Sequence, residues 1–335
     1  MTAGAVADQR RAELPRRIKT TLHPTDRIFH AVSRVIGAMV LVLTGAIGLF
    51  LALQMLPVLH HYGFKFFTMQ DWNPEQNVVG VAAAIVGTIE VALIALALAF
   101  PLALMTALFI TEYTPPQLRS TLVALVDLMA AVPSIVYGLW GFYLLQPQGT
   151  HVARWLAEYF SFIPIFKVDT DAHAALWQQT RFTASAFITG LTVAMMVTPL
   201  ACAVMRGVFA QAPPGEREAA LALGGTRWGV IRSVVLPFGR GAIIGGTMLG
   251  LGRALGETIA VLMVLSQIYK INLRPLQVGG LTVSSLIANR FGEATALQLK
   301  ALLAAGFVLF VMTLAVNTIA GVIVTRSRSG SATEI

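Results

Sequence analysis

The sequence predicts an all-α polytopic membrane protein with six transmembrane helices, and two observations lead to this prediction. The chain of 335 residues is 56% hydrophobic and only 12% charged, and its mean hydropathy is +0.73. Soluble proteins carry about 25% charged residues. Several stretches also remain apolar over the roughly 20 residues that a helix needs to cross about 30 Å of hydrocarbon. The chain is therefore expected to be surrounded mainly by lipid.

Six apolar runs meet the length of a membrane span. Residues 35–59, 183–205 and 301–325 contain no charged side chain. Three further runs contain one or two charges, and they are residues 78–111 with Glu90, 120–145 with Asp127, and 241–269 with Arg253 and Glu257. These six runs make residues 35–325 one transmembrane domain.

The net charge of +8 is distributed unevenly along the chain. Lys and Arg concentrate before the first span and in residues 206–240, which by the positive-inside rule places this loop and both termini in the cytoplasm. Residues 1–34 then form a basic cytoplasmic arm and residues 326–335 a cytoplasmic tail. This pattern indicates topology and contact with anionic membrane lipid, and it does not favour nucleic acid as a partner.

The first apolar run is too long for the core of a cleavable signal peptide, so it is expected to remain as an uncleaved span. Cys202 is the single cysteine and forms no disulfide within the chain.

Prolines divide the second, third and fourth spans. Pro101 predicts a kink in the second span, and Pro115 with Pro116 ends it on the cytoplasmic side. Pro133 predicts a break within the third span, and Pro199 predicts a kink within the fourth. The intervening outer loop, residues 146–181, is long and aromatic enough for an interfacial helix and a docking surface.

Residues 213–237 form the longest polar-to-amphipathic insert between apolar segments. Pro213 and Pro214 are expected to begin a short helix, because proline is tolerated only in the first turn. Glu216 and Glu218 suit the positive end of its dipole. Gly224 can end the helix in a left-handed conformation.

The apolar face of this short helix consists of Ala219, Ala220 and Leu223, and it suits a shallow groove on another protein. The spacing over the whole segment resembles the EAA loop of ABC importer permeases, with Val234 where that loop usually carries Ile. The matching residues are Glu218, Ala219, Ala220, Gly224, Val234, Leu236 and Pro237. The resemblance implies a coupling helix that docks on an ATP-hydrolysing subunit. The alternative is a cytoplasmic loop with no partner.

The fifth span carries the charges that are expected near the bilayer centre. On a continuous helix, Gly241, Gly245, Gly252 and Gly256 form one stripe for close helix contact. A second stripe holds Gly246, Gly250, Arg253 and Glu257.

Arg253 and Glu257 are four residues apart and are predicted to reach each other. Charges at this depth mark functional sites, and a guanidinium fork suits an oxyanion. Glycines on the same stripe are expected to leave room beside the two charges. The alternative is a structural ion pair that holds this span to its neighbours.

Residues 249–261 (Leu-Gly-Leu-Gly-Arg-Ala-Leu-Gly-Glu-Thr-Ile-Ala-Val) and residues 133–140 resemble phosphate permeases of the Pst system, especially the PstC type. The resemblance implies a type I ABC importer permease fold in a bacterial inner membrane and a path for inorganic phosphate. It implies three partners, namely a second, PstA-like permease, a PstB-like ATPase dimer and a PstS-like extracytoplasmic phosphate-binding protein. Arg253 and Glu257 match the intramembrane charges of that family.

Other functions lack the residues they need. The chain contains no phosphate-binding loop, His/Cys cluster or nucleophile elbow, so it is predicted to be neither an enzyme nor a holder of a metal or cofactor. Remaining alternatives are a permease for another oxyanion such as molybdate or sulfate, the partner phosphate permease, and, in another class, a secondary transporter or a channel. The role of Glu90 stays open, and Asp127 is expected to be structural.

Overall fold

The computed structural model describes residues 24–73, 76, 78–168 and 180–327. Most of the predicted arm and tail therefore lies outside the described residues. Contacts divide the chain into two units, Met1–Phe50 and Leu51–Ile335. The described part of the first unit is the beginning of helix α2 (Pro24–Tyr62), whose side chains there are almost all exposed.

Four described helices are long and apolar enough to cross a membrane. They are Thr25–Tyr62 of α2, Ala82–Tyr113, which joins α4 (Ala82–Leu108) to the π-helical turn η2 (Phe109–Tyr113), α9 (Ala186–Phe209), and Ala296–Val324 of α16 (Ala296–Ser327). Two bent helix pairs raise the number of candidate spans to six if each pair crosses once. The predicted helical fold is thus confirmed, with four to six candidate spans.

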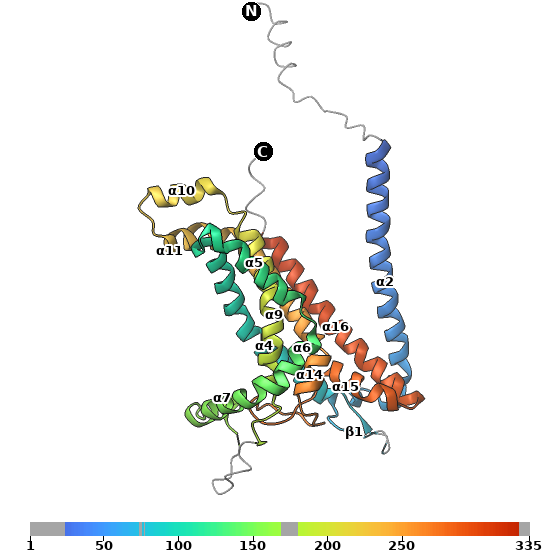
Figure 1. The fold of residues 1–335 in the computed structure, drawn as a ribbon. Helices are drawn as coiled ribbons and strands as arrows, with labels where there is room; N and C mark the ends of the chain where they lie inside the picture. The colour runs from blue at the N-terminus through green and yellow to red at the C-terminus, as the bar shows by residue number, and fades with distance from the viewer. Residues whose placement is uncertain (1–23, 74–75, 77, 169–179, 328–335) are drawn as a thin grey trace, which may run out of the picture. The chain divides into compact units, whose positions relative to one another are not determined.

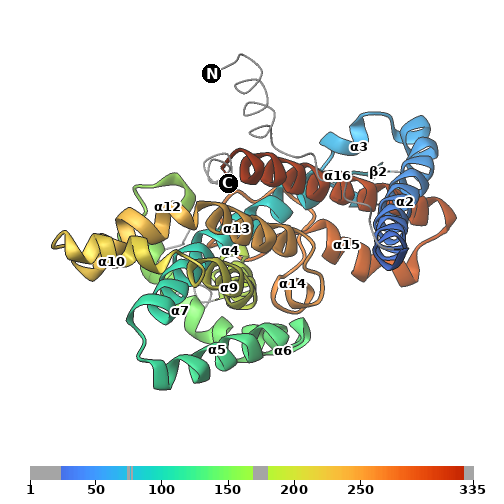
Figure 2. The same cartoon turned by 90° about the horizontal axis from the view of Figure 1, so that it is seen from above.

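Helices α4 and α9 form the most extensive helix pair of the second unit, and Figure 2 shows them at the centre of its bundle. Small residues explain this closeness. Alanines of α4 recur every fourth residue and are fully or almost fully buried, at Ala95, Ala99, Ala103 and Ala107. Without bulky side chains on this face, the two helices approach closely.

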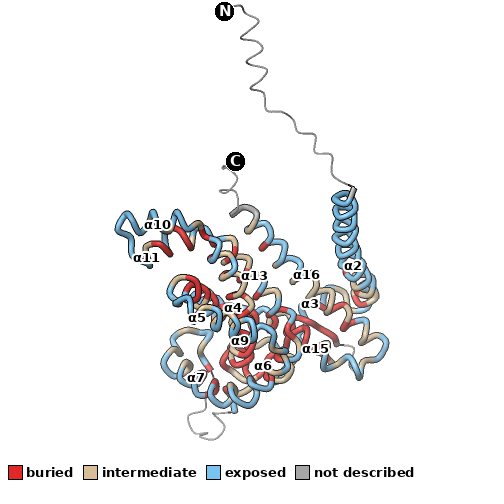
Figure 3. Tube along the Cα trace, turned by 45° about the horizontal axis from the view of Figure 1, so that its top comes forward, coloured by how far each residue is buried: buried red, intermediate tan, exposed pale blue. Residues whose placement is uncertain are grey.

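Three apolar clusters follow one another along α4. Ala83 and Ala84 belong to the first, the segment from Val91 to Ala99 contributes to the second, and Ala103 to Leu108 contributes to the third. Figure 3 shows this buried core at the centre of the bundle and the mostly exposed α10 at its edge.

The predicted break at Pro133 is confirmed as a sharp bend. Helix α5 (Pro116–Ala131) begins directly after Pro115 and makes an angle of 92° with the helical run Ser134–Tyr159. That run consists of α6 (Ser134–Trp140), the π-helical turn η3 (Gly141–Leu145) and α7 (Gln146–Tyr159). The Tyr137 hydroxyl donates a 2.8 Å hydrogen bond to the Met129 carbonyl across the bend, which compensates part of the interrupted helical ladder.

One end of the bundle carries α10 (Pro214–Ala222), as Figure 1 shows. The predicted helix boundaries are confirmed, because Pro213 is the N-cap and Gly224 has a φ of +83°. A further helical run then follows, in the order α11 (Arg227–Val230), η5 (Ile231–Val235) and α12 (Leu236–Phe238).

The chain bends by 69° at Gly239 into α13 (Arg240–Leu255). A side chain at this glycine would collide with the Phe209 ring, so the bend needs glycine there. Helix α13 packs on α9, α16 and α4.

Short elements close the opposite end of the bundle (Figure 1). They are α3 (Lys65–Thr68), an antiparallel pair of β1 (Trp72–Asn73) with β2 (Val78–Val79), η4 (Pro164–Phe166), α14 (Ile259–Val264), α15 (Val283–Arg290) and η6 (Phe291–Glu293). Trp72 faces Val79 in the pair, and both belong to the first apolar cluster.

Candidate functional site

The candidate site is centred on an interruption between α13 and α14. Helix α13 ends at Leu255, and Thr258 has φ −111° and ψ −62°, before α14 begins at Ile259. The predicted continuous helix over residues 241–269 is therefore wrong. The Glu257 carboxylate explains the restart, because its Oε1 accepts a 3.3 Å hydrogen bond from the Ala260 amide at the start of α14.

Arg253 is exposed near the end of α13. Its Nη2 lies 3.6 Å from the sulfur of Met196, close to the middle of α9. Within the described ranges, no carboxylate lies at ion-pair distance from this guanidinium. The predicted contact with Glu257 is wrong, since the helical geometry that would align the two side chains ends at Leu255.

Glu257 instead points into the protein and is only 8% exposed. Its carbonyl accepts a 2.6 Å hydrogen bond from the Ser284 hydroxyl. The amide of the neighbouring Val283 donates a 2.9 Å bond to Thr88 of α4. The interruption is thus tied to α15 and, through it, to α4. Ser284 and Thr88 were missed from the sequence, although hydroxyl residues within apolar segments often join membrane helices.

The glycines of α13 provide contact with neighbouring helices. A Cβ at Gly250 would lie 2.6 Å from a methyl of Val197, and one at Gly246 would lie 3.1 Å from the Ala201 carbonyl. Both glycines therefore allow close packing on α9, and the expectation that they leave open space beside the charges is wrong. On the other stripe, Gly252 faces Asn317 of α16, in agreement with the predicted helix contact.

Glu90 and Asp127 have different surroundings. Oε1 of Glu90, in the middle of α4, is buried and has no hydrogen-bond partner among the residues that the structure describes. Oδ1 of Asp127 lies 2.9 Å from Nη2 of Arg206, which joins α5 to α9, and the Asp127 side chain is 51% exposed. The expected structural role of Asp127 agrees with this ion pair.

Helix α10 exposes most of the residues that were predicted to face a partner, but Ala220 packs against the third apolar cluster of this chain. Glu216, Glu218 and Ala219 are exposed, Ala220 is half-buried, and the Leu223 side chain is 90% exposed. Leu223 is almost fully exposed, and it precedes Gly224, whose backbone is left-handed. The helix therefore ends in an exposed apolar side chain.

Arg217 points from α10 back into the bundle. Its Nη1 lies 3.1 Å from Oε1 of Glu112 and donates a 3.2 Å hydrogen bond to Oε2. Its Nη2 donates a 2.6 Å bond to the Phe209 carbonyl. Sequence reasoning missed this pair. Two features of the sequence could have indicated it. Arg217 lies between Glu216 and Glu218 at the start of a predicted helix, and Glu112 lies shortly before the two prolines that end the second span.

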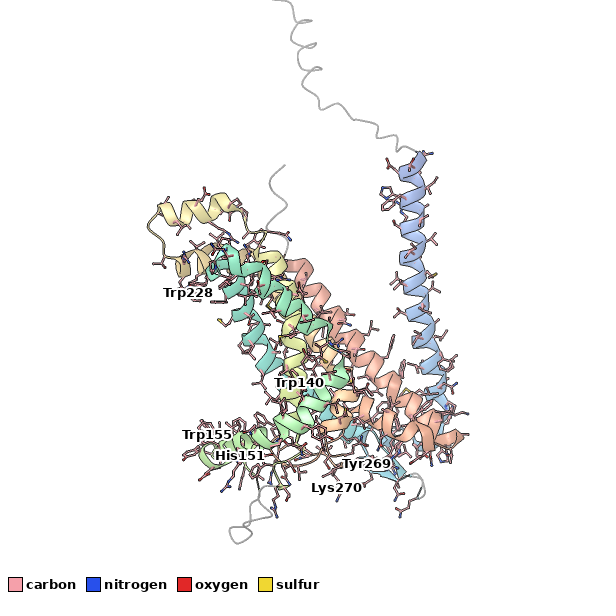
Figure 4. The ribbon with its side chains drawn as sticks, in the orientation of Figure 1. Trp140, His151, Trp155, Trp228, Tyr269 and Lys270 are labelled. Carbon is pink, nitrogen blue, oxygen red and sulfur yellow. The ribbon has the colours of Figure 1, made fainter. Side chains whose placement is uncertain are left out.

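Aromatic side chains occur at both ends of the bundle. Figure 4 shows Trp228 at the α10 end and Trp155, Tyr269 and Lys270 at the opposite end. Such belts are typical of the two membrane interfaces. Among the described residues, no three His, Cys, Asp or Glu side chains lie together so that they could hold a metal ion.

Comparison with known proteins agrees with this architecture. Residues 99–329 match the family described as binding-protein-dependent transport system inner membrane component. A phosphate transport system permease protein PstC from Xylella fastidiosa (strain Temecula1) is 41% identical over 266 residues, which cover 79% of each chain. A protein of the same name from Pasteurella multocida (strain Pm70) is 35% identical, with 91% of this chain and 93% of the relative covered.

Solved structures are similar in fold. A bacterial alginate ABC transporter, solved in complex with an alginate pentasaccharide-bound periplasmic protein, aligns with a TM-score of 0.55 at 19% identity and covers 93% of this chain and 97% of the other. A MetNI methionine ABC transporter in an inward-facing conformation aligns with a TM-score of 0.51 at 13% identity, covering 74% and 95% of the two chains.

Proposed function

Because the chain belongs to the binding-protein-dependent transport system inner membrane components, and among them to the PstC-type phosphate transport permeases, we propose that it forms one half of the path for inorganic phosphate across the bacterial inner membrane. It is a transport subunit and not an enzyme, and separate subunits hydrolyse ATP. We propose as partners a second, PstA-like permease, a PstB-like ATPase dimer and a PstS-like binding protein. This membership leaves a secondary transporter or a channel without support.

The exposed guanidinium of Arg253 carries the proposal. A charge at mid-membrane costs several kcal/mol unless it is paired or wet, and no carboxylate of the described chain neutralises this one. Phosphate oxygens match the fork of an arginine. We place Arg253 at the interface with the second permease, where it contacts phosphate in transit. Glu257, Gly246 and Gly250 set its position, the first through the helix interruption and the glycines through packing on α9.

We infer the topology from the distribution of Lys and Arg, by the positive-inside rule. The α10 end is cytoplasmic, and both termini lie on the same side. Six spans result if each bent pair crosses once, one pair being α5 with the helical run after it and the other being the run Arg227–Phe238 with α13. Helix α10 is the coupling helix, and its exposed residues contact the ATPase, with Leu223 at the centre of the contact.

Phosphate uptake by the reconstituted complex with Arg253→Gln tests the pathway. We expect uptake to fall about 10- to 100-fold, since hydrogen bonds to charged groups contribute about 1.5–3 kcal/mol, while the complex still assembles and hydrolyses ATP. The matched control is Arg290→Gln, which removes an arginine at the opposite end that pairs with Glu293 and Tyr269, and it should keep uptake. Undiminished uptake by the Arg253 variant would reject this site.

The transported ion is tested by competition in the same assay. Excess unlabelled phosphate should abolish uptake of labelled phosphate, whereas sulfate and molybdate should leave it unchanged. Strong competition by either of these anions would instead favour a permease for another oxyanion.

Docking of the ATPase is tested with Leu223→Asp. A carboxylate at the apolar tip should release the ATPase subunit during purification in mild detergent. Leu273→Asp changes a similarly exposed leucine at the opposite end and should retain the subunit. Retention of a fully active ATPase by Leu223→Asp would contradict this docking mode.

A further inference from the structure

The contacts of Arg217 differ from those of the other α10 side chains. The helix is mostly exposed, yet only 24% of the Arg217 side chain and 10% of the Glu112 side chain are accessible. Nη1 faces both carboxylate oxygens of Glu112, and Nη2 binds the Phe209 carbonyl. One guanidinium therefore joins α10 to two separate helices.

The two helices are those at the centre of the bundle. Glu112 lies in η2, which continues α4, and Phe209 is the last residue of α9. Phe209 is fully buried, and its ring occupies the space that a side chain at Gly239 would need. Gly239 is the bend that leads into α13, the helix of Arg253. Continuous packing thus runs from Arg217 to the helix that carries the candidate pathway charge.

We propose that the Glu112–Arg217 pair is the joint through which movement of α10 is transmitted to α4, α9 and α13. The inference rests on the proposed function, because it assigns the pair to coupling between the ATPase and phosphate passage. The pair acts through other residues and is a positioning element. A largely buried guanidinium that binds Glu112 through Nη1 and the Phe209 carbonyl through Nη2 suits this role, because contacts with two separate helices resist rotation of α10 better than a single exposed contact.

A second ion pair near the same end provides a matched control. Asp127 and Arg206 join α5 to α9 at 2.9 Å, but Asp127 is half-exposed and neither residue belongs to α10. If any interhelical ion pair near this end supported coupling, loss of either pair would lower phosphate transport per ATP equally. If α10 acts through its own joint, only loss of the Glu112–Arg217 pair will lower it.

The experiment measures phosphate transported per ATP hydrolysed, using the complete complex with its binding protein in proteoliposomes. Glu112→Gln and Arg217→Gln should each lower this ratio about tenfold while ATP hydrolysis continues, because either change leaves a buried charge without its partner. Arg217→Lys, which keeps the charge but not the fork, should give an intermediate ratio. Exchanging the charges in Glu112→Arg with Arg217→Glu should recover only part of the loss, because a carboxylate at position 217 cannot donate to the Phe209 carbonyl. Asp127→Asn should retain the wild-type ratio.

Three results would overturn the joint. They are an unchanged ratio in both glutamine variants, an equal loss in Asp127→Asn, and release of the ATPase subunit by Arg217→Gln, which would make Arg217 an assembly residue. The wild-type complex separates this inference from the proposed function. If the wild type hydrolyses ATP without moving phosphate, the proposed function fails; if the wild type and both glutamine variants transport with the same ratio, only the joint fails.

Discussion

The charges of the second unit behave differently at the α10 end and in the middle of the bundle. At the α10 end, Arg206 pairs with Asp127 and Arg217 with Glu112. In the middle, Arg253 contacts a methionine sulfur, and Glu90 has a buried oxygen with no partner in the described part of the chain. Paired charges fix helices relative to one another, whereas an unpaired charge at mid-membrane retains the capacity to bind something outside the chain.

Pairing Arg253 artificially should have the largest effect. Met196→Glu would place a carboxylate next to the guanidinium, since the methionine sulfur already lies 3.6 Å from Nη2. The new partner would compete with phosphate, so we expect uptake to fall about 100-fold. Met196→Gln, with the same length and no charge, should lose much less. Equal uptake by the two variants would mean that phosphate transport does not require an unpaired Arg253 guanidinium.

Removing a paired charge should reduce stability. Glu112→Gln leaves Arg217 without its anion, and we expect the free energy of unfolding in detergent to fall by about 1–3 kcal/mol, below the full cost for a buried pair because water reaches part of this one. Thermal unfolding measures the change. Asp127→Asn breaks the more exposed pair and should cost at most about 1 kcal/mol. If Asp127→Asn lost more stability than Glu112→Gln, burial of an ion pair would not determine its contribution to stability.

Loss of one hydrogen bond in the hydroxyl network around the helix interruption should have a smaller effect on phosphate uptake. Ser284→Ala removes the 2.6 Å hydrogen bond to the Glu257 carbonyl, which contributes about 1 kcal/mol. Because this bond fixes the segment next to Arg253, we expect the KM for phosphate uptake to rise a few-fold with little change in the maximal rate. Ser284→Thr retains the hydroxyl and should restore the wild-type KM. A loss of maximal rate alone would point to a general folding defect.

The smallest expected effect is on stability, and it is a gain and not a loss. Glu90→Gln removes the possibility of an unpaired buried charge, and such a charge is costly inside the bundle. We expect the isolated chain to keep its stability or to gain up to about 1 kcal/mol, measured by thermal unfolding in the same detergent as Glu112→Gln. A clear destabilisation by Glu90→Gln would show that its carboxylate already has a partner.

Much of the architecture could be read from the sequence, because local chemistry decides it. Apolar runs predicted the long helices, Pro133 predicted a bend, and Pro213 with Gly224 predicted the boundaries of α10. Motif spacing also indicated the permease family and singled out Arg253. These features depend on residues that are close together in the chain, so pattern and propensity are sufficient.

The tertiary structure alone decided which charges are paired. Helical spacing predicted an Arg253–Glu257 contact, but α13 ends at Leu255, and the Glu257 carboxylate instead accepts a hydrogen bond from the Ala260 amide of α14. The Glu112–Arg217 pair spans 105 residues, and the Glu257–Ser284 bond crosses from one helix end to another. Such contacts depend on how separate helices pack, and hydropathy along a single chain does not record that packing.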